Sequence, residues 1–188
     1  FTLIAGSALL SSTVDPTLTF QICDEAGANC GSWDNAIGFG SLSSSAARWA
    51  TNAGSGSSSD AAAHTMKLAT NSAGGYNLTY NGPTLTSGLN TIGVASITND
   101  ADGTQGSEEF GLGISTDGNA TIATGYDHNA VAGSRDWAWI ASTTTTIASE
   151  TGPTATETFS AYYLANISSA TEAGSYTSTT NYIGTGTF

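Results

Sequence analysis

The chain has 188 residues and a strongly acidic balance, with 15 Asp and Glu residues against three Lys and Arg residues and a formal net charge of −12. Three cations cannot form a basic patch, so the composition disfavours binding to nucleic-acid phosphates or to anionic lipid. The 30 Thr, 25 Ser and 23 Gly residues favour strands and turns over helices, and the length suits a single all-β domain.

The first element in chain order is an apolar segment without charge, FTLIAGSALLSSTV, which ends at Asp15-Pro16. It is apolar on both faces of an extended chain, a pattern that fits a strand inserted between two layers. Pro16 cannot donate to a sheet ladder and restricts Asp15 to extended geometry, so the pair makes a hinge. We therefore expect an extended arm over residues 1–14 and a single β-sandwich domain over residues 15–188; the alternative is an ordinary first strand paired within its own chain. The side chains expected to make the arm's contacts are Phe1, Leu3, Ile4, Ala5, Ala8, Leu9 and Leu10.

Beyond the arm, short stretches of strand-like sequence recur at regular spacing, and no segment has a convincing amphipathic helical pattern. TLTFQI (17–22) alternates apolar and polar residues, as expected for a half-buried strand. Segments 64–70 and 76–80 flank the turn NSAGG and predict a hairpin. About ten to twelve strands without helices are typical of an immunoglobulin-like or jelly-roll-like β-sandwich. Further strands are expected at residues 37–42, 91–97, 108–115, 137–141, 157–168 and 175–188, and a short strand or turn at 47–52.

The two cysteines lie close together in CDEAGANC, as Cys23 and Cys30. A disulfide is the default interpretation of such a pair in an oxidising compartment. The alternative is a metal site, but two cysteines without a nearby histidine make a poor zinc ligand set. No segment reaches the roughly 18 consecutive apolar residues of a membrane helix. We therefore expect a disulfide-bonded, secreted protein of the cell surface, without a membrane span.

Candidate residues for catalysis are few. The chain has two histidines, His64 and His128, and the most enzyme-like cluster is Asp127-His128 with Arg135 and Asp136 nearby in sequence. Sequence neighbours point apart in an extended chain, and no G-x-S-x-G motif marks a nucleophilic serine. Catalysis needs a positioned acid, base and nucleophile. We expect no enzyme activity and no cofactor.

One loop carries the best candidate ligands for calcium. Asp100, Asp102 and Glu108 crowd the polar stretch NDADGTQGSEE, and hard cations prefer such oxygen clusters. The stretch lacks the full spacing of an EF-hand loop, and acidic turns are commonly just solvated. We expect no metal site, with these three residues as weak calcium candidates.

Two features could involve sugars. The N-x-S/T pattern marks Asn77, Asn119 and Asn166 as glycosylation candidates in a host that glycosylates. Trp137 and Trp139 share one face of a predicted strand, which suits either a core or a flat surface for stacking on glycans. We favour a core position for the two tryptophans, and surface glycans are a possible partner.

The C-terminal segment ATEAGSYTSTTNYI, followed by GTGTF, resembles the closing strand of spore-coat-U-type and chaperone–usher pilins. The residues that carry the match are Ala173, Gly174, Tyr176, Tyr182 and Phe188. The resemblance implies an immunoglobulin-like sandwich at a cell surface. In the pilins it also implies assembly by donation of a strand from one subunit to the next.

A second stretch, TNSAGGYNLTYNGPTLTSGLNTI with GSEEFGLGIS, resembles the middle of small secreted bacterial proteins, with Tyr76, Phe110 and Gly111 carrying the match. Together the two resemblances imply a structural subunit of an extracellular filament, which polymerises with copies of itself through its arm. An arm apolar on both faces agrees with that expectation, because an added strand can complete an open sheet edge. The alternatives are a monomeric surface adhesin or carbohydrate-binding sandwich whose arm folds back, and a calcium-binding wall protein.

Overall fold

A computed structural model of the chain describes residue 9 and residues 11–31, 36–129 and 134–188. These residues form thirteen strands and no helix, which confirms the all-β prediction. None of the described segments is therefore a helix long and apolar enough to span a membrane. The strands are β1 (Leu18–Cys23), β2 (Arg48–Trp49), β3 (His64–Thr70), β4 (Tyr76–Asn81), β5 (Thr86–Ser87), β6 (Asn90–Thr91), β7 (Ser96–Ile97), β8 (Glu109–Thr116), β9 (Thr121–Ile122), β10 (Trp137–Ala138), β11 (Thr145–Glu150), β12 (Thr154–Asn166) and β13 (Asn181–Gly186).

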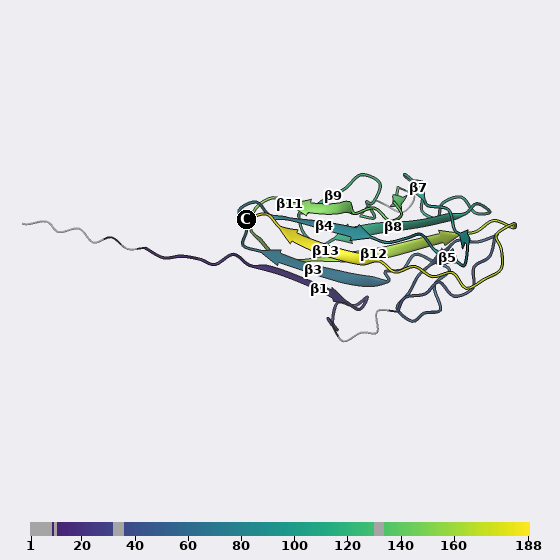
Figure 1. The fold of residues 1–188 in the computed structure, drawn as a ribbon, viewed down its shortest axis with the longest axis horizontal. Coiled ribbons are helices and arrows are strands. Elements are labelled where there is room, and N and C mark those ends of the chain that lie inside the picture. The colour runs from purple at the N-terminus through teal and green to yellow at the C-terminus, as the bar shows by residue number, and fades with distance from the viewer. Residues whose placement is uncertain (1–8, 10, 32–35, 130–133) are drawn as a thin grey trace, which may run out of the picture.

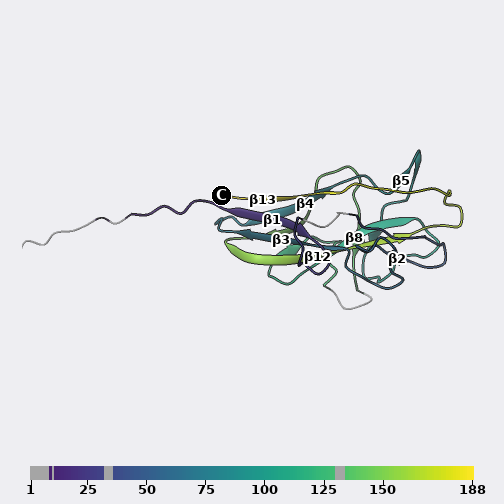
Figure 2. The same ribbon diagram turned by 90° about the horizontal axis from the view of Figure 1, so that it is seen from below.

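Two antiparallel sheets pack together as an elongated β-sandwich (Figures 1 and 2). The larger sheet has the order β1-β3-β12-β8-β10-β7, with β2 paired to β12, and the smaller sheet has the order β13-β4-β11-β9. β5 and β6 form a separate small hairpin. The predicted sandwich is therefore confirmed.

The alternating sequence of the first strand determines its placement. β1 pairs with β3 so that Phe20 lies opposite Leu68 and Ile22 opposite Met66. The apolar residues of β1 are half-buried against the core, whereas Thr19 and Gln21 are exposed. One face of an edge strand is thus solvated, as the alternation predicts.

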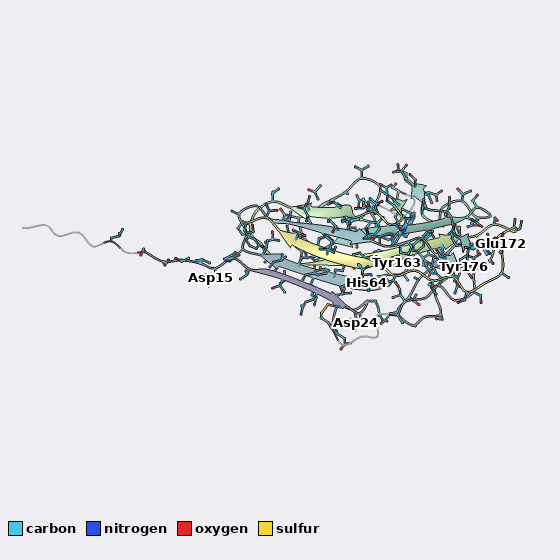
Figure 3. All side chains as sticks on the ribbon, in the orientation of Figure 1. Asp15, Asp24, His64, Tyr163, Glu172 and Tyr176 are labelled. Atoms are coloured by element: carbon cyan, nitrogen blue, oxygen red, sulfur yellow. A yellow bond between two sulfur atoms is a disulfide. The ribbon has the colours of Figure 1, made fainter. Side chains whose placement is uncertain are left out.

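The predicted disulfide between Cys23 and Cys30 is present and closes the loop that follows β1. This loop, in which Asp24 is labelled in Figure 3, is docked onto the neighbouring strand β3. Thr65 Oγ1 donates to the Asp24 carbonyl oxygen over 2.8 Å, and Lys67 Nζ donates to the Gly27 carbonyl oxygen over 2.7 Å. The disulfide and these two bonds hold the end of β1 against the sheet.

The predicted hairpin of segments 64–70 and 76–80 is wrong, although both segments are strands. β3 pairs with β1 and β12 in the larger sheet, whereas β4 pairs with β11 and β13 in the smaller one. The turn at residues 71–75 therefore carries the chain from one sheet to the other. Each strand has a fully buried apolar face, and these faces meet across the sandwich instead of lying side by side. Gly75 makes this crossing with a φ of +73°, at a point where a Cβ would lie 1.8 Å from the Glu150 carbonyl oxygen.

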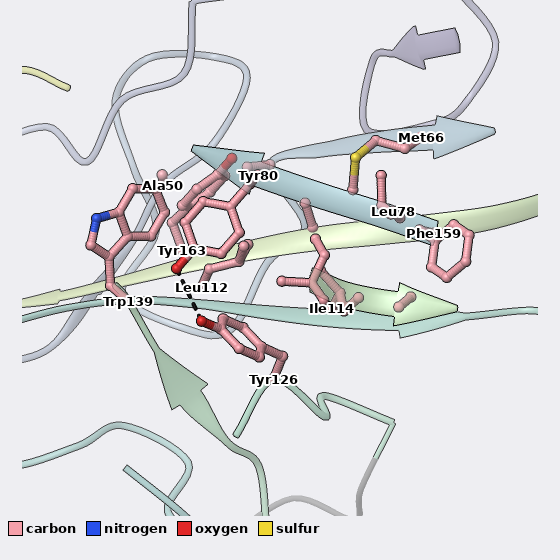
Figure 4. Packing of buried hydrophobic residues seen from close by; sticks show 14 of the residues in the cluster. Ala50, Met66, Leu78, Tyr80, Leu112, Ile114, Tyr126, Trp139, Phe159 and Tyr163 are labelled. Atoms are coloured by element: carbon pink, nitrogen blue, oxygen red, sulfur yellow. Dashed lines mark hydrogen bonds between the residues drawn. The ribbon is translucent and has the colours of Figure 1, made fainter. Parts of the chain in front are cut away.

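The core lies between the two sheets and is rich in aromatic side chains (Figure 4). Trp139 packs with Tyr80 and Phe110, at ring-centroid distances of 4.7 and 4.6 Å, and the Tyr80 and Tyr126 hydroxyls are 3.0 Å apart. Trp137 is also fully buried, but it belongs to a second cluster with β2 and with loops on the other face of the larger sheet. Both tryptophans are core residues, as favoured, and they separate because β10 ends at Ala138, between them.

Candidate functional site

The long edge strands of the two sheets lie on the same side of the sandwich. β1 is the edge of the larger sheet and β13 the edge of the smaller one, and the two strands are in contact (Figure 2). At the end of the molecule where β1 begins and the chain terminates, this side is closed. A Cβ on Gly184 would lie 3.1 Å from Leu68 Cδ2 and 3.3 Å from Phe20 Cγ, so the Phe20 ring already fills the space between the edges.

Towards the opposite end of the molecule the two edges separate and leave a groove. One wall follows the end of β1 and is formed by segment 37–42; the other wall is segment 171–180, which leads into β13. The groove has a volume of about 1080 Å³. Its apolar and aromatic lining consists of Ile22, Ile37, Phe39, Leu42, Leu85, Phe110, Tyr163, Ile167, Tyr176 and Tyr182.

The wall at 171–180 bends at Thr171 and at Gly174 and makes little backbone pairing. Within the described residues, the only backbone-to-backbone pairing of residues 172–180 is between Thr177 and Thr86, with N–H to carbonyl distances of 3.0 and 2.9 Å. The sequence predicts a strand over 175–188, yet the paired strand begins only at Asn181. After the bend at Gly174, residues 175–180 have few backbone partners beside the groove, and such a segment is a template for an added strand.

The inner end of the groove is formed by a histidine and two tyrosines, one from each of three strands. His64 Nε2 lies 3.0 Å from the Tyr163 hydroxyl, which is hydrogen-bonded to the Tyr182 hydroxyl. His64 and Tyr163 are buried, and burial raises the pKa of both tyrosine hydroxyls above the usual range. Burial lowers the pKa of His64 from its usual 6.5 to about 4, so His64 is neutral at pH 7. The inner end is therefore polar but uncharged, which favours an apolar occupant over an ionic one.

The buried histidine predicts a specific loss of stability in acid. The unfolded chain takes up this proton near pH 6.5 but the folded chain only near pH 4, so the free energy of unfolding falls as pH decreases between these values. This loss in the free energy of unfolding should amount to about 3 kcal/mol, and it should be complete once the pH is below 4. Urea unfolding of the native chain and of His64→Gln at pH 7, 5.5 and 4 measures it. The native protein should lose about 3 kcal/mol more than the variant over this range; equal losses would contradict the prediction.

The arm leaves the sandwich at the end opposite to the groove. Figure 3 labels Asp15 at one extremity of the domain and Glu172 at the other. Asn71 holds the base of the arm, since its Nδ2 donates to the Asp15 carbonyl oxygen over 2.7 Å and its Oδ1 accepts from the Thr17 N–H over 2.7 Å. Beyond this clamp the described arm residues point away from the domain, with Val14 80% and Leu9 96% exposed. The other predicted contact residues, Phe1, Leu3, Ile4, Ala5, Ala8 and Leu10, lie outside the described residues.

The three calcium candidates are separate and engaged in bonds within the protein. Asp100 Oδ1 accepts from the Asp102 N–H, Asp102 Oδ2 accepts from Gln105 Nε2, and Glu108 Oε1 accepts from Thr171 Oγ1. In the part of the chain that the structure describes, no three His, Cys, Asp or Glu residues gather as a metal ligand set. The acidic loop is thus held by hydrogen bonds within the loop and by one bond from Thr171.

The three glycosylation candidates differ in exposure. Asn77 on β4 and Asn119 in the turn before β9 are exposed. Asn166 is 1% exposed, and its Nδ2 donates to the Asp102 carbonyl oxygen and to Glu109 Oε2. A glycan on Asn166 would therefore have to be attached before folding.

Two members of the most enzyme-like cluster, His128 and Arg135, meet at a third residue, whereas Asp127 and Asp136 accept bonds from the Asn129 and Asn99 N–H groups instead. His128 Nε2 lies 3.1 Å from Asp60 Oδ1, and Arg135 forms an ion pair with the other oxygen of Asp60. The His128 ring stacks on Tyr162 at 3.6 Å. Asp60 comes from a distant loop, so the network fastens the loop containing His128 to its surroundings, and the charges are paired with one another.

A buried carboxylate joins the two sheets, and the sequence analysis missed it. Glu157 on β12 is 4% exposed; it accepts hydrogen bonds from the Tyr76 hydroxyl of β4 and from the backbone N–H groups of Asn119 and Ala120. Burial raises the pKa of the Tyr76 hydroxyl, and the bond to Glu157 adds to this effect. The only signal in the sequence is one acidic residue within a strand rich in Thr and aromatic residues, and it does not reveal the partners.

Comparisons with protein-family models, with curated proteins and with solved structures find no match to this chain. The functional argument therefore depends on the geometry of the groove and of the arm.

Proposed function

We propose that the protein is the structural subunit of an extracellular filament, in which the arm of one copy fills the groove of the next. The observation that carries the proposal is the placement of the two features at opposite ends of the domain (Figure 3). An apolar segment leaves one end, and a groove with an apolar and aromatic floor and a sparsely paired wall opens at the other. The arm of one copy can therefore occupy the groove of the next copy.

The chemistry of the two partners supports the match. Residues 1–10 of the arm carry five large apolar side chains, and no charged side chain precedes Asp15. The groove offers apolar and aromatic side chains together with a comparable share of polar ones, mostly Ser and Thr. Each large apolar side chain removed from water contributes roughly 1.5–3 kcal/mol. Ordering the arm offsets part of this stabilisation, whereas backbone pairing with the sparsely paired wall stabilises the contact further.

A contact between unlike surfaces at opposite ends does not close on itself. Such a heterologous contact repeats from copy to copy and forms a ring or an open fibre, and alignment of the two ends along the long axis favours the fibre. The disulfide and the acidic, Lys-poor composition support an extracellular location for this fibre. The alternative is a monomeric adhesin or glycan-binding sandwich whose own arm folds back into the groove.

Removing residues 1–12 tests the proposal. The truncated chain should stay folded, because the described arm residues are exposed and the Asn71 clamp at Asp15 and Thr17 is retained. It should form no filaments in electron micrographs and should elute as a monomer, whereas the intact chain forms filaments. The peptide FTLIAGSALLSS should bind the truncated chain and raise its thermal midpoint.

A scrambled peptide of the same composition is the control for this experiment. Filaments of the truncated chain would contradict the proposal. An intact chain that stays monomeric, with a truncated chain that unfolds, would instead support the alternative in which the arm pairs within its own chain.

A further inference from the structure

We infer that the outer face of the smaller sheet pairs with the same face of a second copy and thereby joins neighbouring filaments side by side. The joining of filaments rests on the proposed function, whereas the pairing of two faces does not. Three properties of this face carry the inference: it is uncovered, it has no charge, and its side chains can bond to copies of themselves.

Three rows of side chains run across the outer face of the smaller sheet. Tyr76, Leu78 and Tyr80 of β4 point into the core, so the residues of β4 between and after them point outwards. Residues directly opposite each other in antiparallel strands share a face, so the register of the neighbouring strands gives the other members of each row. The rows are Thr121, Ser149, Asn77 and Thr185; Thr146, Thr79 and Ile183; and Thr144, Asn81 and Asn181.

Within the described residues this face is uncovered. Asn77, Thr121, Thr146 and Thr185 are exposed, and Ile183 is 45% exposed. The larger sheet differs, because β2 and nearby loops pack on part of its outer face. β4 and β13 lie on one side of the sandwich and β3 and β12 on the other (Figure 2). The smaller sheet therefore offers its outer face to another molecule.

The lack of charge distinguishes this face in a strongly acidic protein. None of the residues in the three rows is charged, although the chain has 15 acidic residues and a net charge of −12. Copies that approach each other through acidic surfaces repel, and only salt weakens this repulsion. Two copies can approach through the outer face of the smaller sheet without bringing carboxylates together.

The side chains of this face are complementary to themselves. Ser and Thr hydroxyls and Asn amides both donate and accept hydrogen bonds, so a face made of them can bond to an identical face. A two-fold contact brings two identical patches together. Ile183 and the Thr methyl groups add apolar area to the contact. Two twisted sheets pack face to face at about 30°, as the two sheets of a sandwich do.

The size of the face determines when the contact holds. Four strands about 4.8 Å apart and three rows about 6.8 Å apart cover roughly 400 Å². A stable complex buries roughly 800 Å² on each partner, which is twice this area. Single copies should therefore associate only weakly. A filament repeats the face in every copy, so many weak contacts add together between two filaments.

Opposite charges placed on the face test the self-contact. Thr146 is exposed on β11, one of the two inner strands of the sheet, so a two-fold contact brings it close to its counterpart in the other copy. Filaments of Thr146→Glu and of Thr146→Lys should each lie singly in electron micrographs, whereas filaments of the native chain form bundles. A mixture of the two variant filaments should form bundles again, because Glu then meets Lys.

Thr19→Glu is the matched control, since Thr19 is exposed on β1 of the larger sheet, and it should form bundles as the native chain does. Bundling by Thr146→Lys alone would overturn the self-contact, because the face would then dock on an acidic surface. Single filaments of the native chain, or bundles of Thr146→Glu, would also overturn it and leave the proposed filament intact. A glycan on Asn77 of the native protein, found by mass spectrometry, would overturn it as well, because the glycan would cover the face.

A second measurement does not require filaments. Concentrated Thr146→Cys protein, with copper–phenanthroline as the oxidant, should form disulfide-linked dimers at least about tenfold faster than Thr19→Cys, because the contact raises the effective concentration of the two thiols. Equal rates would contradict the pairing of the faces. An intact chain that forms no filaments but shows this preference would refute the proposed function and support the pairing.

Discussion

Replacing Glu157 by alanine is expected to lower the free energy of unfolding by about 3–5 kcal/mol, the cost of removing one partner of a buried charged network. The substitution leaves the Tyr76 hydroxyl and the N–H groups of Asn119 and Ala120 without their acceptor in the interior. It also leaves a cavity over Gly118, where the carboxylate now packs. For a protein of this size each kcal/mol corresponds to roughly 2–4 °C in the thermal midpoint.

Two control variants separate the loss of the buried hydrogen-bond acceptor from the mere loss of a carboxylate. Glu25→Ala removes an exposed carboxylate, which accepts from Asn52 Nδ2, and should change stability by less than about 0.5 kcal/mol. Glu157→Gln keeps one oxygen for the two backbone N–H groups and should restore most of the loss. Chemical denaturation of the three variants measures these differences. A Glu157→Ala protein as stable as Glu25→Ala would show that the carboxylate does not hold the two sheets together.

A single carboxylate in the groove is expected to stop assembly without unfolding the subunit. Thr180 lines the groove and is half-buried in the isolated domain, so Thr180→Asp stays hydrated in the monomer. Insertion of the apolar arm would remove water from this charge without supplying a partner, at a cost of several kcal/mol. The affinity for the arm should fall roughly a hundredfold or more, since each 1.4 kcal/mol is a factor of ten.

The matched control is Thr185→Asp, which introduces the same charge at an exposed position of β13 outside the groove. Both variants should unfold at nearly the same temperature, but only Thr185→Asp should form filaments in electron micrographs. Filaments of normal length from Thr180→Asp would place the subunit contact elsewhere.

The fold class could be predicted from the sequence because its signals are local. The alternation of TLTFQI, the paired cysteines and the absence of helical patterns each depend on a few neighbouring residues. The assignment of strands to sheets could not be predicted in the same way. A turn such as NSAGG can connect two strands of one sheet or two strands of different sheets. Here the strands belong to different sheets because their buried faces pack against each other across the core.

The candidate site could be predicted only in part. The arm is visible in the sequence as an uncharged apolar stretch, but the groove depends on residues distant in sequence, such as Ile22, Phe110 and Tyr182. Segment 175–180 has a strand-like sequence, but among the described residues no strand lies on its open side, and a local pattern cannot reveal that absence. The bonds of Glu157 and of Asn71 likewise join segments that only the tertiary structure brings together.

Mixing two complementary defective chains tests the central claim most directly. The chain lacking residues 1–12 has a groove but no arm, and full-length Thr180→Asp has an arm but an impaired groove. Each alone should be a monomer by light scattering, and an equimolar mixture should form a complex of two chains that grows no further. Two monomers that do not combine, or an equal tendency of Thr180→Asp alone to polymerise, would contradict assembly by an arm in the next subunit's groove.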